Sequence, residues 1–299
     1  MDDILAPRFI DAKAARKHLE ALRWPDGAEC PHCGLINATA VTGGRDGLYQ
    51  CNACREQFTV TVGTVFERSK VPLNKWLLCN HLLCSSKKGM SAHQIHRMLG
   101  VTYKTAWFMC HRLREAMKPA SPEPMGGPGV TVEADETHVG GKARNRASRK
   151  VAPKQIVMTL VERGGVARSF HVANIHGNTL RSVLATNVDR ASNLMTDDAR
   201  AYWAVGREFA SHGTTLHNLR QFVVGEKHSN TAENFFSIFK RGVIGTYHHL
   251  SAVHLHRYTA EFDFRYNSRN ENDRVRADIN LGQIGGKRLT YRRTDKLAA

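Results

Sequence analysis

The chain has 299 residues, of which 41% are hydrophobic, so it can bury a core and is not a disordered protein. Lys and Arg number 43 against 27 Asp and Glu, which gives a formal net charge of +16. This excess favours a polyanionic partner, because phosphates would relieve the repulsion between like charges. The sequence has no apolar run long enough to cross a membrane, and its acidic start, MDDILAPRF, is unlike a signal peptide. We therefore expect a cytoplasmic protein without a membrane partner.

Two C-x-x-C pairs follow a short amphipathic helical lead over residues 1–25. The pairs are Cys30 with Cys33 and Cys51 with Cys54, and their spacing is typical of a zinc site with four thiolates. The alternative, redox-active cysteines, is typical of a single pair beside a βαβ unit, which this region lacks. We predict a zinc ribbon over residues 26–68 that binds structural Zn²⁺.

Residues 69–118 have the periodicity of three helices. Ser91 is placed to cap the second helix and Thr102 the third, with Gly100 in the turn between them. A helix, a turn with glycine and another helix form the helix-turn-helix pattern, although three-helix units that bind no DNA are also common. The side chains expected to contact DNA from the third helix are Lys104, Arg112 and Arg114.

The segment 119–129, PASPEPMGGPG, is predicted to be a linker because its prolines and glycines suit neither a helix nor a central strand. Beyond it, apolar alternation predicts strands over 130–135, 155–162 and 167–174 and a further strand over 192–198. A helix is expected between the third and fourth of these strands, so the region is predicted to be an α/β domain.

A basic loop, Gly140 to Lys150, follows the first of these strands. Lys142 and Arg144 in this loop are expected to contact nucleic acid, although a charge run can also be merely solvated.

The stretch HSNTAENFFSIFKRG, residues 228–242, predicts a helix with a polar and an aromatic face. Ser229 or Asn230 is expected to cap it, and Gly242 to end it. Glu233 and Lys240 share the polar face, which is also what a solvated face with a chance charge pair would show.

Three acids from separate elements are expected to meet: Asp135 and Asp197 at the ends of strands, and Glu233 on this helix. Like charges persist together only around a divalent cation, so the three favour a site for two Mg²⁺ or Mn²⁺ ions of the kind that cleaves phosphodiesters.

The segments VEADETHVGGK, MTDDARAYWAVG and HSNTAENFFSIFKRGVIGTYHHLS resemble the catalytic domain of Merlin-related bacterial insertion-sequence transposases, and the two C-x-x-C pairs match the zinc ribbon of that group. The resemblance implies a ribonuclease-H-like fold with a D-D-E or D-D-N triad and a lysine seven residues after the third acid. Carried over to this chain, the triad is Asp135, Asp197 and Glu233, the lysine is Lys240, and Asn230 is the amide alternative for the third position. Asn230 and Arg241 are also expected to contact DNA.

The activity implied by the resemblance is two-metal cleavage of transposon ends and their joining to double-stranded target DNA, carried out by at least a dimer in the bacterial nucleoid. A DNA-binding regulator derived from a transposase, or a hydrolytic nuclease without strand transfer, remains open. The predicted fold class is α/β, with a helical lead (1–25), a zinc ribbon (26–68), a helix-turn-helix region (69–118), a linker (119–129), a ribonuclease-H-like catalytic domain (130–275) and a basic C-terminal tail (276–299).

Overall fold

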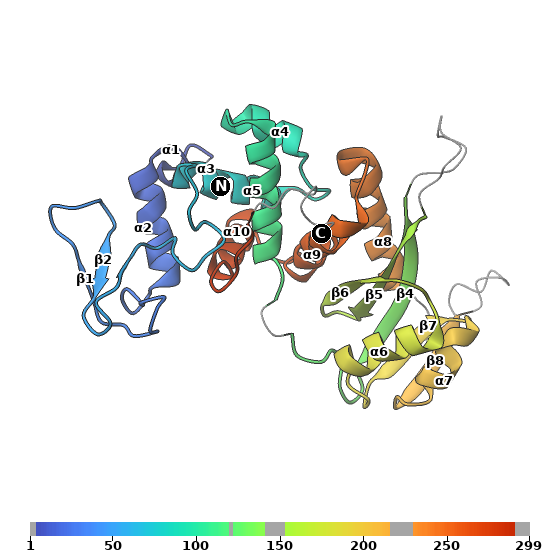
Figure 1. Ribbon diagram of the computed structural model, residues 1–299. Helices are drawn as coiled ribbons and strands as arrows, with labels where there is room; N and C mark the ends of the chain where they lie inside the picture. The colour runs from blue at the N-terminus through green and yellow to red at the C-terminus, as the bar shows by residue number, and fades with distance from the viewer. Residues whose placement is uncertain (1–3, 120–121, 141–152, 216–229, 291–299) are drawn as a thin grey trace, which may run out of the picture. The chain divides into compact units, whose positions relative to one another are not determined.

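The computed structural model describes residues 4–119, 122–140, 153–215 and 230–290 (Figure 1). The chain divides into two compact units. The first unit combines residues 1–119 with residues 271–299, and the second unit is residues 120–270. No helix among the described residues is both long enough and apolar enough to span a membrane.

The first unit opens with two short helices, α1 (Pro7–Ile10) and α2 (Ala12–Arg23). Asp11 caps α2 by accepting a hydrogen bond from the Ala14 N–H at 2.7 Å. A three-stranded antiparallel sheet follows, formed by β1 (Ala38–Ala40), β2 (Tyr49–Cys51) and β3 (Gln57–Phe58). Trp24 packs edge-on against Tyr49 and Phe58, which anchors this small sheet to the end of α2. The structure therefore confirms the predicted ribbon.

Three helices follow the ribbon, namely α3 (Leu73–Ser85), α4 (Ala92–Leu99) and α5 (Tyr103–Ala116). The predicted caps are present, since Ser91 accepts a hydrogen bond from the Gln94 N–H and Thr102 accepts one from the Thr105 N–H, both at 3.2 Å. Gly100 has φ 59°, a left-handed conformation that ends α4 and that glycine adopts without strain. The helix-turn-helix pattern of the sequence is thus formed.

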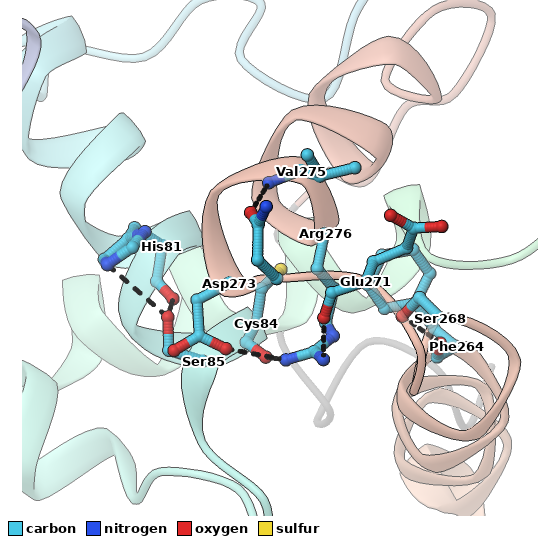
Figure 2. A network of polar contacts seen from close by, with 10 residues as sticks. His81, Cys84, Ser85, Phe264, Ser268, Glu271, Asp273, Val275 and Arg276 are labelled. Atoms are coloured by element: carbon cyan, nitrogen blue, oxygen red, sulfur yellow. Dashed lines mark hydrogen bonds and ion pairs between the residues drawn. The ribbon is translucent and has the colours of Figure 1, made fainter. Parts of the chain in front are cut away.

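A last helix, α10 (Asp273–Gly282), returns to the first unit and packs on α3. The buried Asn80 side chain donates to the Ala277 carbonyl at 2.8 Å, and Asn280 donates to Asn80 at 2.6 Å. Arg276 donates to the carbonyls of Cys84 and Glu271 at 3.2 and 2.7 Å (Figure 2). Residues 276–282, expected in a basic tail, are therefore helical, because Ala277, Asn280 and Leu281 form a buried face at helical spacing.

The second unit contains a five-stranded sheet with the order β6-β5-β4-β7-β8. Its strands are β4 (Thr131–Val139), β5 (Gln155–Glu162), β6 (Ala167–Val172), β7 (Asn193–Asp197) and β8 (Ser211–Thr215). β4, β7 and β8 run parallel, whereas β5 is antiparallel to both of its neighbours. β8 was not predicted, and its sequence, SHGTT, has no apolar alternation to indicate a strand.

Helices cover both faces of this sheet (Figure 1). On one face the core includes side chains of α6 (Gly177–Asn187), the 3-10 turn η2 (Arg200–Tyr202) and α7 (Trp203–Gly206). The other face carries α8 (Asn230–Gly242) and α9 (Ala252–Asn267). The second unit is thus the three-layer α/β domain expected of a ribonuclease-H-like fold.

The predicted aromatic face of α8 is buried, and consists of Ala232, Phe235, Phe236 and Phe239. Gly242 ends the α-helical hydrogen bonding but not the helical path, since it keeps φ −66° and leads into a π-helical turn, η4 (Val243–Tyr247).

Part of the expected linker also belongs to the second unit. Met125 is 2% exposed, and its N–H donates to the Asn187 carbonyl at 2.7 Å. The apolar methionine within a run of proline and glycine is the feature that docks this segment.

Candidate active site and zinc centre

The four cysteines of the ribbon lie together, with all their sulfur atoms within 4.8 Å of one another. The Cys30–Cys54 and Cys33–Cys51 sulfur pairs are each 3.6 Å apart. A tetrahedral zinc with Zn–S bonds of ~2.3 Å requires sulfurs ~3.8 Å apart, so this cluster fits the ion. Hydrogen bonds from the Cys54 and Ala53 N–H groups lower the pKa of Cys51 to about 6. At Cys54 a backbone hydrogen bond is outweighed by desolvation and the neighbouring thiols, which raise the pKa of Cys54 to about 12, so Cys51 is the thiolate favoured first.

The first two acids lie on adjacent parallel strands. Asp135 is in the middle of β4, so the prediction that it ends a strand is wrong: β4 continues to Val139 through its pairing with β5. Asp197 is the last residue of β7, as predicted. The register pairs Glu133 with Met195, and two residues further along both strands Asp135 lies level with Asp197. Side chains at the same level of neighbouring strands share a face, so these two carboxyl groups lie on one face of the sheet.

Glu136, the next residue of β4, has a defined partner. The Tyr202 hydroxyl donates to its carboxyl at 2.6 Å, and Tyr202 is fully buried. Burial raises the pKa of Glu136 to about 7; the Tyr202 hydrogen bond opposes the rise, and the charges of Asp197 and Asp135 add to it. The carboxyl groups of β4 and β7 therefore interact electrostatically. Both residues lie within the segments that resemble transposases, but their contact was not predicted from the sequence.

Glu133 is the residue of this region that sequence reasoning missed. It is fully buried, and its carboxyl accepts hydrogen bonds from the Thr231 and Ala232 N–H groups at 2.9 and 3.0 Å. The Thr231 hydroxyl also donates to it at 3.0 Å, and the Arg163 guanidinium at 2.7 Å. Asn230 is the first residue of α8, so it does not precede the helix as a cap would, and Ser229 lies outside the described residues. A glutamate between the apolar Val132 and Ala134 was the available signal.

The polar face of α8 is exposed, as predicted. Asn230, Glu233, Lys240 and Arg241 are all exposed, and the Lys240 ammonium is 6.0 Å from the centre of the Phe236 ring. Within the described part of the chain, the four ribbon cysteines are the one group of three or more metal-binding side chains close enough together to hold an ion. Asp135, Asp197 and Glu233 do not form such a group in this structure.

Two family models match the chain. Residues 126–267 match an ISXO2-like transposase domain, and residues 11–57 match a transposase zinc-ribbon domain. Both the zinc ribbon and the second unit of this chain are therefore similar to domains of insertion-sequence transposases. The first matched range contains all three candidate acids, and the second contains all four cysteines.

Among individual proteins, the chain is similar to an uncharacterized protein in transposable element ISH50 of Halobacterium salinarum. The two are 29% identical over 258 residues, which covers 78% of this chain and 83% of the relative. Among solved structures, a simian T-cell lymphotropic virus intasome in complex with the PP2A regulatory subunit B56 gamma matches at 15% identity and a TM-score of 0.29. That match covers 56% of this chain and 64% of the other, which is less than two thirds of its length.

The basic residues that the sequence offered for DNA contact differ in exposure. Lys104 is exposed on α5, and Lys142 and Arg144 lie outside the described residues. Arg114 is 2% exposed, and Arg112 donates to the carbonyls of Glu67 and Leu289 at 3.1 and 3.2 Å. Burial therefore contradicts a DNA contact by Arg114, because α5 packs against α3, α4 and α10. The contact of the half-buried Arg112 stays a prediction.

A groove that the sequence did not indicate lies beside the ribbon of the first unit. It has a volume of about 720 Å³ and is bounded by α2, the loop before β2 and the start of α3. Lys13, Arg16, Arg45 and Lys70 line it, and Arg16 pairs with Asp46 at 2.8 Å. The other three cations make no ion pair with any residue that the structure describes. The groove thus offers three positive charges to an anion.

Proposed function

We propose that this protein is a DNA transposase that cuts the ends of an insertion sequence and joins them to target DNA by metal-dependent phosphoryl transfer. The two matched family models support the transposase activity, and one structural observation supports metal-dependent phosphoryl transfer. That observation is the level placement of Asp135 and Asp197 on adjacent strands, beside a helix that carries Glu233 and is anchored to the same strand as Asp135.

The three carboxyl groups would hold Mg²⁺ or Mn²⁺, since these cations prefer oxygen ligands. Bound there, the ions would activate the attacking oxygen and stabilise the leaving oxygen of a phosphodiester. Asp135 and Asp197 are held in place by their strands, whereas Glu233 would approach them from the exposed face of α8. Lys240, two helical turns further along the same face, would place a phosphate by its charge.

The DNA partner would be double-stranded, both at the transposon ends and at the target. The groove of the first unit supports this partner, because Lys13, Arg45 and Lys70 line it together and could neutralise phosphates. Lys104 on α5, and Asn230 and Arg241 on α8, would add further contacts. Pairing two DNA ends requires at least a dimer, and a protein with this partner would work in the nucleoid of the cytoplasm.

The test is cleavage of labelled terminal DNA in Mg²⁺ by Asp135→Asn, Asp197→Asn and Glu233→Gln. An amide nearly matches the carboxyl in shape but removes its charge, so each variant should fold and bind DNA yet lose at least about a hundredfold in cleavage rate. Asp198→Asn is the matched control, since it removes the neighbouring acid, and it should retain activity.

The outcomes separate the alternatives. Cleavage without joining would identify a hydrolytic nuclease, and DNA binding without metal-dependent cleavage would identify a regulator. An active Glu233→Gln together with an inactive Asn230→Ala would move the third position of the triad to the amide.

A further inference from the structure

We infer that Glu133 is a positioning residue for the active site, a buried carboxyl group that docks the first turn of α8 on β4 and thereby sets the place of Glu233 relative to Asp135. The docking stands on the contacts of Glu133 alone. Its consequence for the metal site rests on the proposed function.

The first contact is between a charge and a helix end. The first four N–H groups of a helix have no partner within the helix, and the helix dipole places partial positive charge there. In α8 the Thr231 and Ala232 N–H groups both donate to one oxygen of Glu133, which precedes them by 98 and 99 residues. Glu133, a residue of the sheet, thus caps α8, whereas α2, α4 and α5 are each capped by the residue that precedes the helix.

The second contact balances the charge of this buried carboxyl. Arg163, in the turn between β5 and β6, donates to the other oxygen of Glu133 at 2.7 Å, and its own N–H donates to the Thr131 carbonyl of β4 at 3.0 Å. The Thr231 hydroxyl donates to the same oxygen. Glu133 therefore accepts four hydrogen bonds and has a cation beside it, which is what allows a carboxyl group to be fully buried.

The placement of this clamp connects it to the site. Glu133 lies two residues before Asp135 on one face of β4, and Thr231 lies two residues before Glu233 on α8. The aromatic face of α8 holds the helix against the sheet, but apolar packing is non-directional and sets its position along the sheet less sharply than hydrogen bonds do. Displacement of a catalytic group by ~1 Å can cost ~100-fold in rate.

The decisive variant is Glu133→Gln. Glutamine keeps one acceptor oxygen and replaces the other with an N–H₂ group, which in either orientation faces existing donors. We expect the Thr231 and Ala232 amides to exchange hydrogen about tenfold faster, the ratio given by loss of one charge-assisted hydrogen bond of ordinary strength. We also expect the zinc-loaded, full-length protein to bind Mn²⁺ about tenfold more weakly, as measured by electron paramagnetic resonance titration.

Thr231 supplies a second, milder pair of variants. Thr231→Val removes one hydroxyl donor with little change of shape, and should shift both readouts in the same direction by a smaller factor. Thr231→Ser keeps the hydroxyl and should restore wild-type values. If Glu133→Gln does not fold, Thr231→Val and Thr231→Ser still test whether the contact with Glu133 positions α8.

Glu208→Gln is the matched control. It removes a carboxyl group of the same unit that pairs with Arg181 and Arg190 at 2.6 and 2.8 Å, away from α8, and it should change neither readout.

Faster exchange with unchanged Mn²⁺ affinity in Glu133→Gln and Thr231→Val would overturn the positioning role, and unchanged exchange would overturn the docking itself. Both readouts are independent of DNA cleavage, so an inactive wild-type protein would refute the proposed function without deciding this inference.

Discussion

The hydrogen bond between Tyr202 and Glu136 gives a prediction whose size depends on pH. Tyr202→Phe removes the hydroxyl that donates to Glu136 at 2.6 Å and leaves the ring in place. A hydrogen bond to an ionised group contributes about 1.5–3 kcal/mol to stability, and one between neutral groups about 0.5–1.5 kcal/mol. Because the pKa of Glu136 is about 7, the carboxyl group is mainly ionised at pH 8.5 and mainly protonated at pH 5.5. The variant should therefore lose about 1–2 kcal/mol more at pH 8.5 than at pH 5.5.

Proton linkage determines how the stability of the second unit changes with pH. The folded-state pKa of Glu136 is raised from 4.5 to about 7, so the second unit holds this proton more tightly when folded. Stability is then greatest below pH 4.5 and falls as the pH rises through 7, by an upper bound of about 3 kcal/mol from this group. Tyr202 opposes the rise in pKa, so Tyr202→Phe raises the pKa of Glu136 further and extends the fall to higher pH.

The assay needs a signal from the second unit alone. The chain has four tryptophans, and Trp203 is the one within residues 120–270. The ¹⁹F resonance of 5-fluorotryptophan at this position, assigned with Trp203→Phe, follows urea unfolding of that unit at the two pH values without added Mg²⁺. Tyr266→Phe is the control for loss of a tyrosine hydroxyl elsewhere, and its effect should not depend on pH. Equal losses for Tyr202→Phe at both pH values would refute the reasoning.

Two further predictions concern the first unit. Cys51→Ser should abolish binding of one zinc ion per chain, as measured by elemental analysis. It should also increase hydrogen exchange over residues 26–68, because the metal supplies folding free energy to a small ribbon. Retained zinc in this variant would contradict the prediction. Replacing Lys13, Arg45 and Lys70 with alanine should flatten the salt dependence of DNA affinity by roughly 0.9 units of slope for each lost phosphate contact. Lys17→Ala, an exposed lysine of α2 outside the groove, should leave the slope unchanged, and an equal effect of both sets of variants would show that the groove binds no phosphate.

What the sequence predicted correctly depends on signals between residues close together in the chain. The cysteine pairs, the caps at Ser91 and Thr102, and the aromatic face of α8 each lie within a few residues, where helix and turn geometry determines the outcome. The α/β class followed from the order of such segments. All these features follow from local periodicity and capping, which need no knowledge of the tertiary structure.

What the sequence did not predict depends on contacts between distant segments. The sequence predicted that Asp135 and Asp197 meet, but not the register that places them level on strands 62 residues apart. The cap of α8 comes from a residue 98 positions earlier. Arg114 was expected to contact DNA because it lies on the third helix of the helix-turn-helix pattern, but neighbouring helices enclose its part of α5. The burial and the partners of polar core residues such as Glu133 cannot be predicted from local sequence patterns.

The return of α10 to the first unit has a consequence for how the protein is made. The hydrogen bonds between Asn80 and α10 join segments separated by the whole second unit, about 200 residues of chain. At a synthesis rate of roughly 5–20 residues per second, the ribosome takes roughly 10–40 s to deliver α10 after α3 has been made. During that interval the second unit is already synthesised while α3 still lacks its partner. The unit that carries the zinc ribbon and the basic groove is thus begun first and completed last, so a nascent chain that stops within the second unit cannot complete it.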